Sequence, residues 1–366
     1  MNGLQLCEIR EGLARLLVPN VPRGKGPGKY TGLPFYNPSM EKNRDMTVLL
    51  LRALDRTGIS FLDGLSATGV LGIRVALEVP GTRVSCNDWN SDASRLDLKN
   101  AEMNGVKLEI VANEKLQAHL SKTSYEFIDI DPFGTPLPFL DVAFQAVPKG
   151  GFIGITATDT AVLCGAQANA CFRRYEARPL HIDCCKEIGL RILIGCCARA
   201  AARHDKAIIP ILSFSADHYM RAIMAVDIGA KKADETFRHL GYVIYDSETG
   251  ERSLSRSIPA AGNLAGPLWA DGLLDMKTVS RLKPLQHMRH GTSQLVEHLK
   301  AEVGAPSLFY DSDFLSKMLR KSPPKLPRLI DSLRSAGFVA IRTHFSPEGV
   351  KTDAPWAALV EAYANA

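Results

Sequence analysis

Short apolar runs alternate with amphipathic stretches from about residue 48 onward, which predicts strands that alternate with helices. The first two runs, at 59–63 and 83–88, each lead into a stretch of helical periodicity, and these stretches end near Glu78 and Asn104. Further runs that predict strands lie at 106–111, 125–131, 151–156, 208–214 and 222–226. Such alternation favours a parallel, doubly wound α/β sheet, which binds ligands at the carboxyl ends of its strands.

A change in sequence character divides the chain into two predicted domains. A helical stretch at 170–202 is followed by a polar, hairpin-like segment at 245–250 and by a segment rich in Gly, Pro and Ala at 259–267. Breaks of this kind are typical of a domain boundary. We therefore expect an α/β domain over residues 1–265 and a smaller α+β domain over residues 266–366.

The second predicted domain is basic. Residues 314–321 and 326–336 are expected to form helices, and 337–342 a strand, an order that suggests a winged-helix-like module. Between Phe314 and Lys351 there are eight Lys or Arg against two Asp or Glu, whereas the net charge of the whole chain is +5. This asymmetry fits contact with a polyanion, although a solvated basic face explains the charge alone equally well.

The composition indicates an ordinary globular protein. Hydrophobic residues make up 46% and charged residues 23% of the 366 positions. No apolar run reaches the roughly 18 residues of a membrane span, and charges interrupt the first twenty positions, so we expect a cytoplasmic protein without a signal peptide. The eight cysteines show no C-x-x-C spacing, which favours small buried thiols on helices over a zinc site.

A loop of small residues after the first predicted strand is a candidate cofactor site. Asp63-Gly-Leu-Ser-Ala-Thr-Gly69 leads into a helix, so the backbone can approach a ligand at the helix N-terminus. The loop lacks the G-x-G-x-x-G spacing that a dinucleotide pyrophosphate requires. It suits a cofactor without phosphates, such as S-adenosylmethionine, whose amino-acid tail would lie near Asp63 and Ser66.

Acidic residues at the next two strand ends extend this candidate site. Asp88 lies 25 residues past Asp63, where its carboxylate can accept hydrogen bonds from both hydroxyls of a ribose. Glu114 and Lys115 follow the third predicted strand and are candidates to recognise the adenine edge. Each acid alone could be a helix N-cap, but three in order on successive strand ends favour the cofactor.

The sequence Asp131-Pro-Phe-Gly134 ends the fourth predicted strand and carries the candidate chemistry. Alternation along the strand places Asp129 and Asp131 on one face, but only Asp131 reaches the rim. A nucleobase amine is a poor nucleophile, and the Asp131 carboxylate and a backbone carbonyl at Pro132 can accept its two N–H bonds while Phe133 stacks on the unstacked base. Methyl transfer is an in-line displacement, so positioning supplies most of the rate. The alternative is an ordinary β-turn.

Six stretches of the sequence carry a family resemblance. They are Phe35-Tyr-Asn-Pro-Ser-Met-Glu-Lys-Asn-Arg-Asp45, Asp63-Gly-Leu-Ser-Ala-Thr-Gly69, Asp129-Ile-Asp-Pro-Phe-Gly134, Thr156-Ala-Thr-Asp-Thr-Ala-Val-Leu-Cys-Gly165, Gly266-Pro-Leu-Trp269 and Arg342-Thr-His-Phe-Ser-Pro347. In these stretches the chain resembles the tRNA (guanine-26-N2)-dimethyltransferase family. The resemblance implies a Rossmann-like class I methyltransferase domain, S-adenosylmethionine as methyl donor, tRNA as partner, and one or two methyl additions to guanine N2 where the D and anticodon stems meet.

The resemblance also implies roles for single residues. Arg44 matches the family's cofactor-binding arginine, which would pair with the methionyl carboxylate. Phe35 would form the other side of a base sandwich with Phe133, whereas Phe35 taken alone would be interpreted as core. Phosphate contacts with tRNA would come from the basic C-terminal stretch, including Arg320, Lys321, Lys325 and Arg328. Arg334 or Arg342 would instead support packing of the module itself.

Other positions depart from the family pattern or remain open. Leu71 stands where archaeal members carry arginine, so one cofactor contact is missing or replaced. Residues 246–265 contain no cysteine, so we expect no zinc. The basic, Gly-rich loop at 23–29 either touches RNA phosphates or is disordered, and Asp159 either borders the pocket or caps the next helix.

Two alternative functions are weighed against this interpretation. The D-P-F-G motif also suits an amino methyltransferase acting on rRNA or DNA, although the C-terminal match argues against one. A non-catalytic RNA-binding relative is supported only by Leu71 and opposed by Arg44, Asp88 and Asp131. Neither a protein partner nor a membrane contact is indicated.

Overall fold

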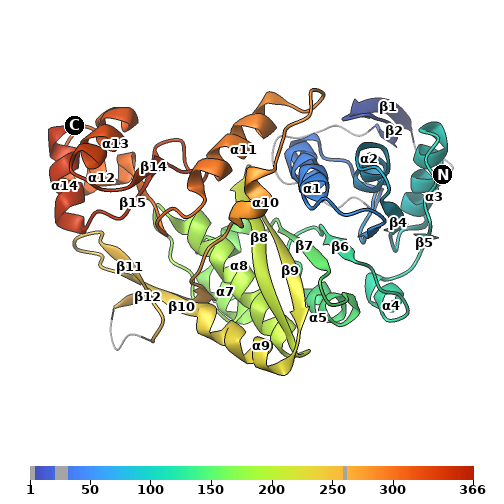
Figure 1. The fold of residues 1–366 in the computed structure, drawn as a ribbon, viewed down its shortest axis with the longest axis horizontal. Coiled ribbons are helices and arrows are strands. Elements are labelled where there is room, and N and C mark those ends of the chain that lie inside the picture. Colours follow the sequence, from blue (N-terminus) through green and yellow to red (C-terminus); the bar gives the residue numbers. More distant parts are fainter. Residues whose placement is uncertain (1–4, 21–31, 259–261) are drawn as a thin grey trace.

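The computed structural model describes residues 5–20, 32–258 and 262–366, so the predicted RNA-contacting loop at 23–29 lies outside the described residues. A seven-stranded sheet forms the centre (Figure 1). Its strands are Ser60–Asp63 (β3), Arg83–Asn87 (β4), Val111–Ala112 (β5), Phe127–Ile130 (β6), Phe152–Ala157 (β7), Lys206–Ala216 (β8) and Tyr219–Ile228 (β9).

The order β5-β4-β3-β6-β7-β9-β8 confirms a doubly wound, Rossmann-like α/β fold. The strands from β5 to β7 pair in parallel, but β9 is antiparallel to both of its neighbours. The predicted all-parallel sheet is therefore wrong at this position. Only Asp217 and His218 separate β8 from β9, and two residues can close a hairpin but not a parallel crossover.

Apolar residues on both faces of the sheet belong to two separate cores. Phe61 and Phe127 pack into one core, whereas their chain neighbours Leu62 and Ile128 pack into the other, as the pleat of a strand requires. The helices of this part are Glu41–Ala53 (α1), Val70–Glu78 (α2), Ser91–Met103 (α3), Leu116–Leu120 (α4), Leu137–Ala146 (α5), Thr160–Leu163 (α6), Ala168–Tyr175 (α7), Cys185–Ala202 (α8) and Ala230–Thr236 (α9), and short 3-10 turns span Pro38–Met40 and Phe237–His239.

Two elements of this part differ from the sequence-based expectations. The third strand was expected at 106–111 but is limited to β5 at its very end. The helical region expected at 170–202 is interrupted between α7 and α8, because Glu176 ends α7 in the left-handed conformation and Pro179 follows.

Of the eight free cysteines, Cys86, Cys171, Cys184 and Cys197 are buried.

An N-terminal hairpin that the sequence analysis did not anticipate covers one end of the sheet. Its strands are Leu6–Glu11 (β1) and Ala14–Pro19 (β2). The hairpin packs on α2 and α3, where the backbone N–H of Leu17 donates to Asn100 Oδ1 over 2.7 Å. The turn of the hairpin brings Glu11 into the protein, where the side chain is 2% exposed.

A second sheet follows the central one. Its strands Leu240–Tyr245 (β10), Arg252–Ser255 (β11) and Asn263–Trp269 (β12) lie in the order β11-β10-β12, and the predicted hairpin at 245–250 joins β10 to β11. The domain boundary expected between 265 and 266 falls inside β12, which packs against α8. Beyond it, Met276–Ser280 (α10) and His290–Glu302 (α11) pack against α1.

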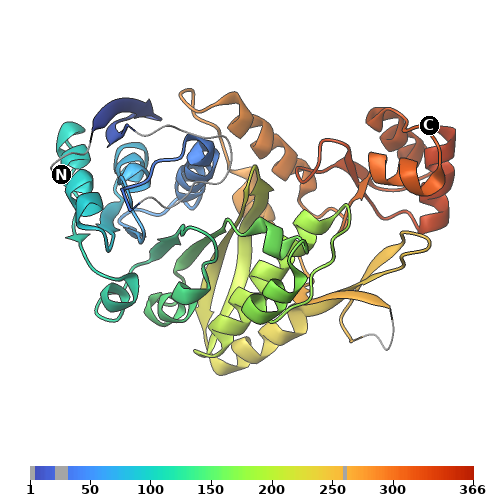
Figure 2. The same ribbon diagram turned by 180° about the vertical axis from the view of Figure 1, so that it is seen from behind.

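The C-terminal residues form a small module with its own core. Its elements are Tyr310–Asp311 (β13), Ser312–Leu319 (α12), Leu326–Ser335 (α13), Ala340–Arg342 (β14), Gly349–Thr352 (β15) and Trp356–Asn365 (α14). The predicted helix–turn–helix–strand order is present, and the sheet order β13-β15-β14 agrees with a winged-helix-like arrangement. This module and the N-terminal hairpin lie at opposite ends of the molecule (Figures 1 and 2). Within the described ranges, no helix has the length and apolarity needed to cross a membrane.

Candidate active site

A cavity of about 530 Å³ opens at the carboxyl ends of the parallel strands. Nine of the ten residues singled out from the sequence line this cleft, namely Phe35, Arg44, Asp63, Ser66, Asp88, Lys115, Asp131, Pro132 and Phe133. The tenth, Glu114, does not line it. The Glu114 carboxylate accepts a hydrogen bond from Lys122 Nζ over 2.7 Å and lies 3.1 Å from His119 Nδ1.

Asp131 lies at the end of β6, where a buried amide holds its carboxylate. Asn43 Nδ2 donates to Asp131 Oδ2 over 3.2 Å and lies 3.3 Å from Thr156 Oγ1. Burial raises the pKa of Asp131 to about 6, and the negative charge of Asp129 contributes to the rise. This carboxylate is therefore ionised at neutral pH but close to a pH at which it takes up a proton.

Asp129 does not line the cleft, and its contacts are structural. Its side chain is 1% exposed and forms an ion pair with Arg221 of β9. Arg221 also donates hydrogen bonds to Thr156 Oγ1 and Thr47 Oγ1, each over 3.0 Å. These contacts fix the floor of the cleft beneath Asp131.

Two aromatic rings stand at the mouth of the cleft. Phe133 is 45% exposed, and its ring centroid lies 4.8 Å from that of Phe35 at an interplanar angle of 58°. The rings touch one another, so a base fits between them only after one ring moves. The base sandwich inferred from the resemblance therefore stays a prediction, whereas an exposed Phe133 face is present for stacking.

Carboxylates also fix the loop between β3 and α2. Asp88 accepts the backbone N–H groups of Ala67 and Asn90 over 3.0 and 2.8 Å, and Asp97 accepts the Ser66 hydroxyl over 2.6 Å. Gly69 has a φ of +70°, and a Cβ atom there would lie 2.7 Å from Asp97 Oδ1, so this position requires glycine. The loop is thus held rigidly along the cleft.

Asp63 is a buried acid at the start of this loop. Its Oδ2 accepts the backbone N–H of Gly72 over 3.1 Å. Burial, together with the nearby charge of Asp129, raises the pKa of Asp63 to about 8. Asp63 can therefore hold a proton near neutral pH, and a positively charged group beside it would favour its ionised form.

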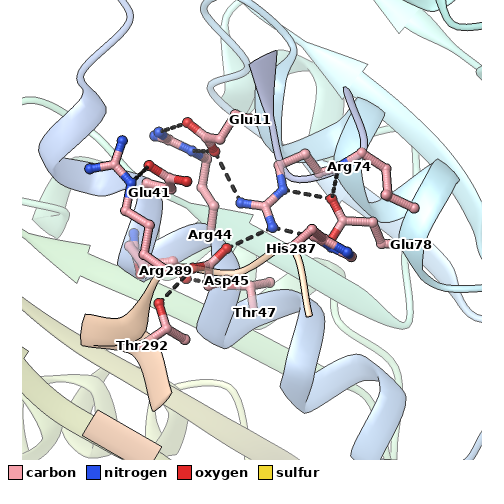
Figure 3. A network of polar contacts seen from close by, with 12 residues as sticks. Glu11, Glu41, Arg44, Asp45, Thr47, Arg74, Glu78, His287, Arg289 and Thr292 are labelled. Carbon is pink, nitrogen blue, oxygen red and sulfur yellow. Dashed lines mark hydrogen bonds and ion pairs between the residues drawn. The ribbon is translucent and has the colours of Figure 1, made fainter. Parts of the chain in front are cut away.

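Arg44 lines the cleft and is anchored by a buried charge network (Figure 3). Its Nε donates to Glu11 Oε1 over 2.6 Å and its Nη2 to Glu11 Oε2 over 2.5 Å. Glu11 also contacts Arg74 Nη1 at 3.1 Å. Burial opposes ionisation of Glu11, but the two arginines outweigh this effect and lower its pKa to about 2. Glu11 itself does not line the cleft, so it holds Arg44 from outside the cavity.

The network extends from α2 to the helices near the C-terminal module. Arg74 contacts Asp45 at 2.6 Å and Glu78 at 2.8 Å, and its side chain is fully buried. Glu78 is 2.9 Å from His287, and Thr292 of α11 donates to Asp45 over 2.6 Å. Figure 3 shows these side chains converging between the N-terminal hairpin, α1 and α2.

Asp159 meets neither of the two expectations for it. It stands at the N-cap of α6 without a side-chain capping bond, and it does not line the cleft. Its carboxylate instead accepts a hydrogen bond from the Tyr175 hydroxyl over 2.7 Å and contacts Arg174 at 3.3 Å.

Several residues at the cleft were not identified from the sequence. Trp89, which lines the cleft and is 60% exposed, directly follows Asp88, and that position is a signal that could have been used. Asn43 stands inside a stretch that carries the family resemblance but received no role. Asp217, His218 and Tyr219 come from the β8–β9 hairpin, where the sequence contains no motif.

The lining residues fit the chemical groups of S-adenosylmethionine. Arg44 offers a cation for a carboxylate, and Asp88 offers acceptors for a ribose diol. Trp89 and Leu71 provide apolar surface beside them, which suits a purine ring. Leu71 is 7% exposed, so the position that departs from the family pattern contributes apolar rather than charged surface.

Comparison with known proteins gives consistent matches over nearly the whole chain. The family model described as N2,N2-dimethylguanosine tRNA methyltransferase matches residues 30–364. The tRNA (guanine(26)-N(2))-dimethyltransferase of Pyrococcus furiosus is 40% identical over 383 residues, covering 98% of each chain, and that of Methanosarcina acetivorans is 36% identical over 375 residues, covering 95% of each. The structure of Trm1 from Pyrococcus horikoshii in complex with S-adenosyl-L-methionine matches with a TM-score of 0.87 at 37% identity, covering 98% of this chain and 99% of that one.

Proposed function

Because this chain belongs to the N2,N2-dimethylguanosine tRNA methyltransferase family, we propose that its cleft holds S-adenosylmethionine beside the N2 amine of guanine 26 in tRNA. The chain is an S-adenosylmethionine-dependent tRNA (guanine-N2) methyltransferase. The observation that supports the assignment of the reaction to this cleft is the Asp131 carboxylate, which lies at the end of β6 within the cavity that Arg44 and Asp88 also line.

The cofactor-binding residues are assigned from their positions in the cleft. Arg44, held by Glu11, pairs with the methionyl carboxylate, and Asp63 faces the amino-acid tail together with Ser66. Asp88 accepts the ribose hydroxyls, and the adenine lies near Trp89 and Lys115. Glu114 is supported less well, because its carboxylate is engaged by Lys122 outside the cleft.

The chemistry of the reaction depends on how the amine is oriented. S-adenosylmethionine supplies an electrophilic methyl group on a sulfonium centre. The Asp131 carboxylate and the backbone carbonyl at Pro132 accept N–H bonds from the guanine amine and direct its nitrogen along the line of displacement. Phe133 stacks on the base and helps to exclude water. When the amine forms its new bond, Asp131 can take up the proton that the nitrogen releases, since its pKa is close to 6.

The protonation of Asp131 predicts the pH dependence of the rate. The pKa of this carboxyl is raised in the folded protein to about 6, so the active carboxylate is present above that pH and is lost as the pH falls through it. We expect the single-turnover methylation rate to fall about tenfold for each pH unit below 6. The rate is measured between pH 5 and 8 with saturating cofactor and tRNA. A rate that stays constant down to pH 5 would rule out a role for the ionised carboxylate.

We propose that the chain works as two functional units, a methyltransferase unit over residues 1–265 and a tRNA-contacting unit over 266–366, which share strand β12 at their boundary. Four basic residues of the second unit, Arg320, Lys321, Lys325 and Arg328, are exposed around the start of α13. Arg334 has a packing role, because its Nε donates to the backbone oxygen of Ala340 over 2.9 Å. We propose a cytoplasmic location for this activity, because the substrate of its family is tRNA.

Replacement of these four residues by alanine tests the tRNA-contacting unit. Each phosphate contact contributes roughly 0.7 to 0.9 to the slope of log affinity against log salt. The quadruple variant should therefore bind tRNA more weakly, with a slope smaller by up to about 3.6, while it binds S-adenosylmethionine normally. Filter binding at several salt concentrations measures the slope. Lys231→Ala on α9 is the control, and a quadruple variant with the same slope as this control would refute the assignment.

The overall function is tested with purified chain, S-adenosylmethionine and tRNA transcripts that carry either guanine or adenine at position 26. Nucleoside mass spectrometry should find N2-methylated guanosine only in the guanine transcript. Methylation of rRNA or DNA but not of tRNA would favour the broader amino methyltransferase instead. Absence of both methylation and calorimetric cofactor binding would favour a non-catalytic RNA-binding relative.

A further inference from the structure

Tyr219 is a buried residue of the cleft that has no role in the reaction as described above. It begins β9 directly after the hairpin turn, and it lines the cleft together with Asp217 and His218. Its side chain is 1% exposed, and its ring meets that of Phe214 edge-on with centroids 6.1 Å apart. The hydroxyl has no hydrogen-bond partner among the residues that the structure describes. Burying an unpaired hydroxyl is unfavourable, so a polar group of a ligand is the natural partner.

Contacts from the C-terminal module hold this residue in place. Ser215 Oγ donates to the backbone oxygen of Tyr219 over 3.4 Å, and the backbone N–H of Ser215 donates to His344 Nε2 over 3.3 Å. His344 Nδ1 in turn lies 2.7 Å from Glu302 Oε1. Because His344 accepts through one ring nitrogen, the other carries the proton and donates to Glu302. These contacts fix the backbone of Tyr219, and the ring contact with Phe214 limits where its side chain can lie before any substrate enters.

The order of the strands places Tyr219 on the substrate side of the cleft. The cofactor loop follows β3, and Asp88 follows β4, whereas Asp131 follows β6. Tyr219 starts β9, which is separated from β6 by β7 and lies on the side opposite to β3. Along the strand order, Asp131 therefore stands between the cofactor residues Asp63 and Asp88 on one side and Tyr219 on the other. A base whose amine is held by Asp131 would direct its far side toward the Tyr219 hydroxyl.

The chemistry of guanine indicates what the hydroxyl does. The N2 amine is flanked by N1–H, a donor, and by N3, an acceptor. A carboxylate can accept from the amine and from N1–H but cannot satisfy N3, which requires a donor. Burial, reinforced by the charges of Asp217 and Asp131, raises the pKa of Tyr219 well above its usual value, so its hydroxyl keeps its proton.

We propose that the Tyr219 hydroxyl donates a hydrogen bond to N3 of the target guanine and so contributes to recognition of this base. The proposal rests on the proposed function, because it takes guanine N2 as the methylated amine. Tyr219 completes a set in which Asp131 reads the donors around the amine and Tyr219 reads the acceptor beside them.

The test combines one substitution in the protein with one in the RNA. Tyr219→Phe removes the hydroxyl but keeps the ring against Phe214, and 3-deazaguanine at the target position replaces N3 by a C–H group. Each change alone should lower kcat/KM for tRNA roughly tenfold, and the two together should cost little more than either one, because both delete the same hydrogen bond. Calorimetry should give the same Kd for S-adenosylmethionine in the variant and the unaltered chain. Tyr245→Phe on β10, outside the cleft, is the matched control and should behave like the unaltered chain.

Three results would overturn the proposal. In the first, Tyr219→Phe has the same kcat/KM as the unaltered chain on the guanine transcript. In the second, the two changes lower kcat/KM independently, so that their effects multiply. In the third, the variant loses cofactor affinity, which would assign the hydroxyl to the cofactor. These results are distinct from failure of the proposed function. If the proposed function fails, the unaltered chain itself leaves the guanine transcript unmethylated, and the role given to Tyr219 is contradicted as well.

Discussion

Asp131→Ala is expected to lower the methylation rate by about 10³-fold while S-adenosylmethionine binds with nearly unchanged affinity. Asp131 lies at the end of β6 and is held there by the amide of Asn43 at 3.2 Å, whereas Arg44 and Asp88 approach the cleft from other elements. Removal of the carboxylate thus leaves the cofactor residues in place but leaves the guanine amine without its principal acceptor. The loss should appear in kcat rather than in the Kd of the cofactor.

Asp131→Asn tests the negative charge of the side chain separately from its shape. The amide keeps the volume of the side chain and one acceptor oxygen, but it cannot take up a proton. We expect Asp131→Asn to remain severely impaired and to lose the decline in rate below pH 6, because the titrating group is gone. Single-turnover rates and calorimetry on both variants measure the two effects. Full activity in either variant would show that the carboxylate has no part in the reaction.

Arg74→Met is expected to lower the free energy of unfolding by about 3 to 5 kcal/mol. The Arg74 side chain is fully buried and contacts three carboxylates, those of Glu11, Asp45 and Glu78 (Figure 3). Methionine fills a similar volume but leaves these acids buried near one another without their shared cation. The cost arises from the charges left behind rather than from lost packing.

The destabilised variant should also depend on pH in a characteristic way. Arg74 lowers the pKa values of Glu11 and Glu78 against the effect of burial. Without Arg74, burial would raise the pKa of Glu78 above its value in the unfolded chain, so the folded state would gain stability as the pH falls and this acid takes up a proton. Urea unfolding of Arg74→Met at pH 7 and pH 5 should show a smaller deficit at pH 5. Arg95→Met, which removes an exposed ion pair with Asp92, is the control and should change stability by less than about 1 kcal/mol. Equal stability of the two variants at pH 7 would contradict the role given to the network.

Three of the residues predicted correctly to line the cleft could be placed from the strand pattern alone. Asp63, Asp88 and Asp131 each follow an apolar run, and the carboxyl ends of parallel strands meet at one edge, so periodicity was sufficient to bring them together. Glu114 follows the same pattern, yet its side chain turns to Lys122. Position at a strand end fixes where the backbone lies, but nearby charges decide where a long side chain points.

Two of the residues that were missed depend on contacts between distant parts of the chain. Glu11 reaches Arg44 only because the N-terminal hairpin packs on α2 and α3, and no periodicity in either segment encodes that pairing. Tyr219 enters the cleft because β9 turns back antiparallel after two residues, whereas the strand pattern had predicted a parallel sheet. Such contacts follow from tertiary packing, which the local pattern of the sequence does not specify.

The central claim is that one cleft brings the Asp131 carboxylate to the methyl group that is transferred. A crystal structure of the chain with bound S-adenosylmethionine tests it most directly. We predict that the methionyl carboxylate pairs with Arg44, that the ribose lies on Asp88, and that the methyl carbon points toward Asp131 beside the exposed face of Phe133. A cofactor whose methyl group faces away from Asp131, with no open path between the two, would contradict the claim.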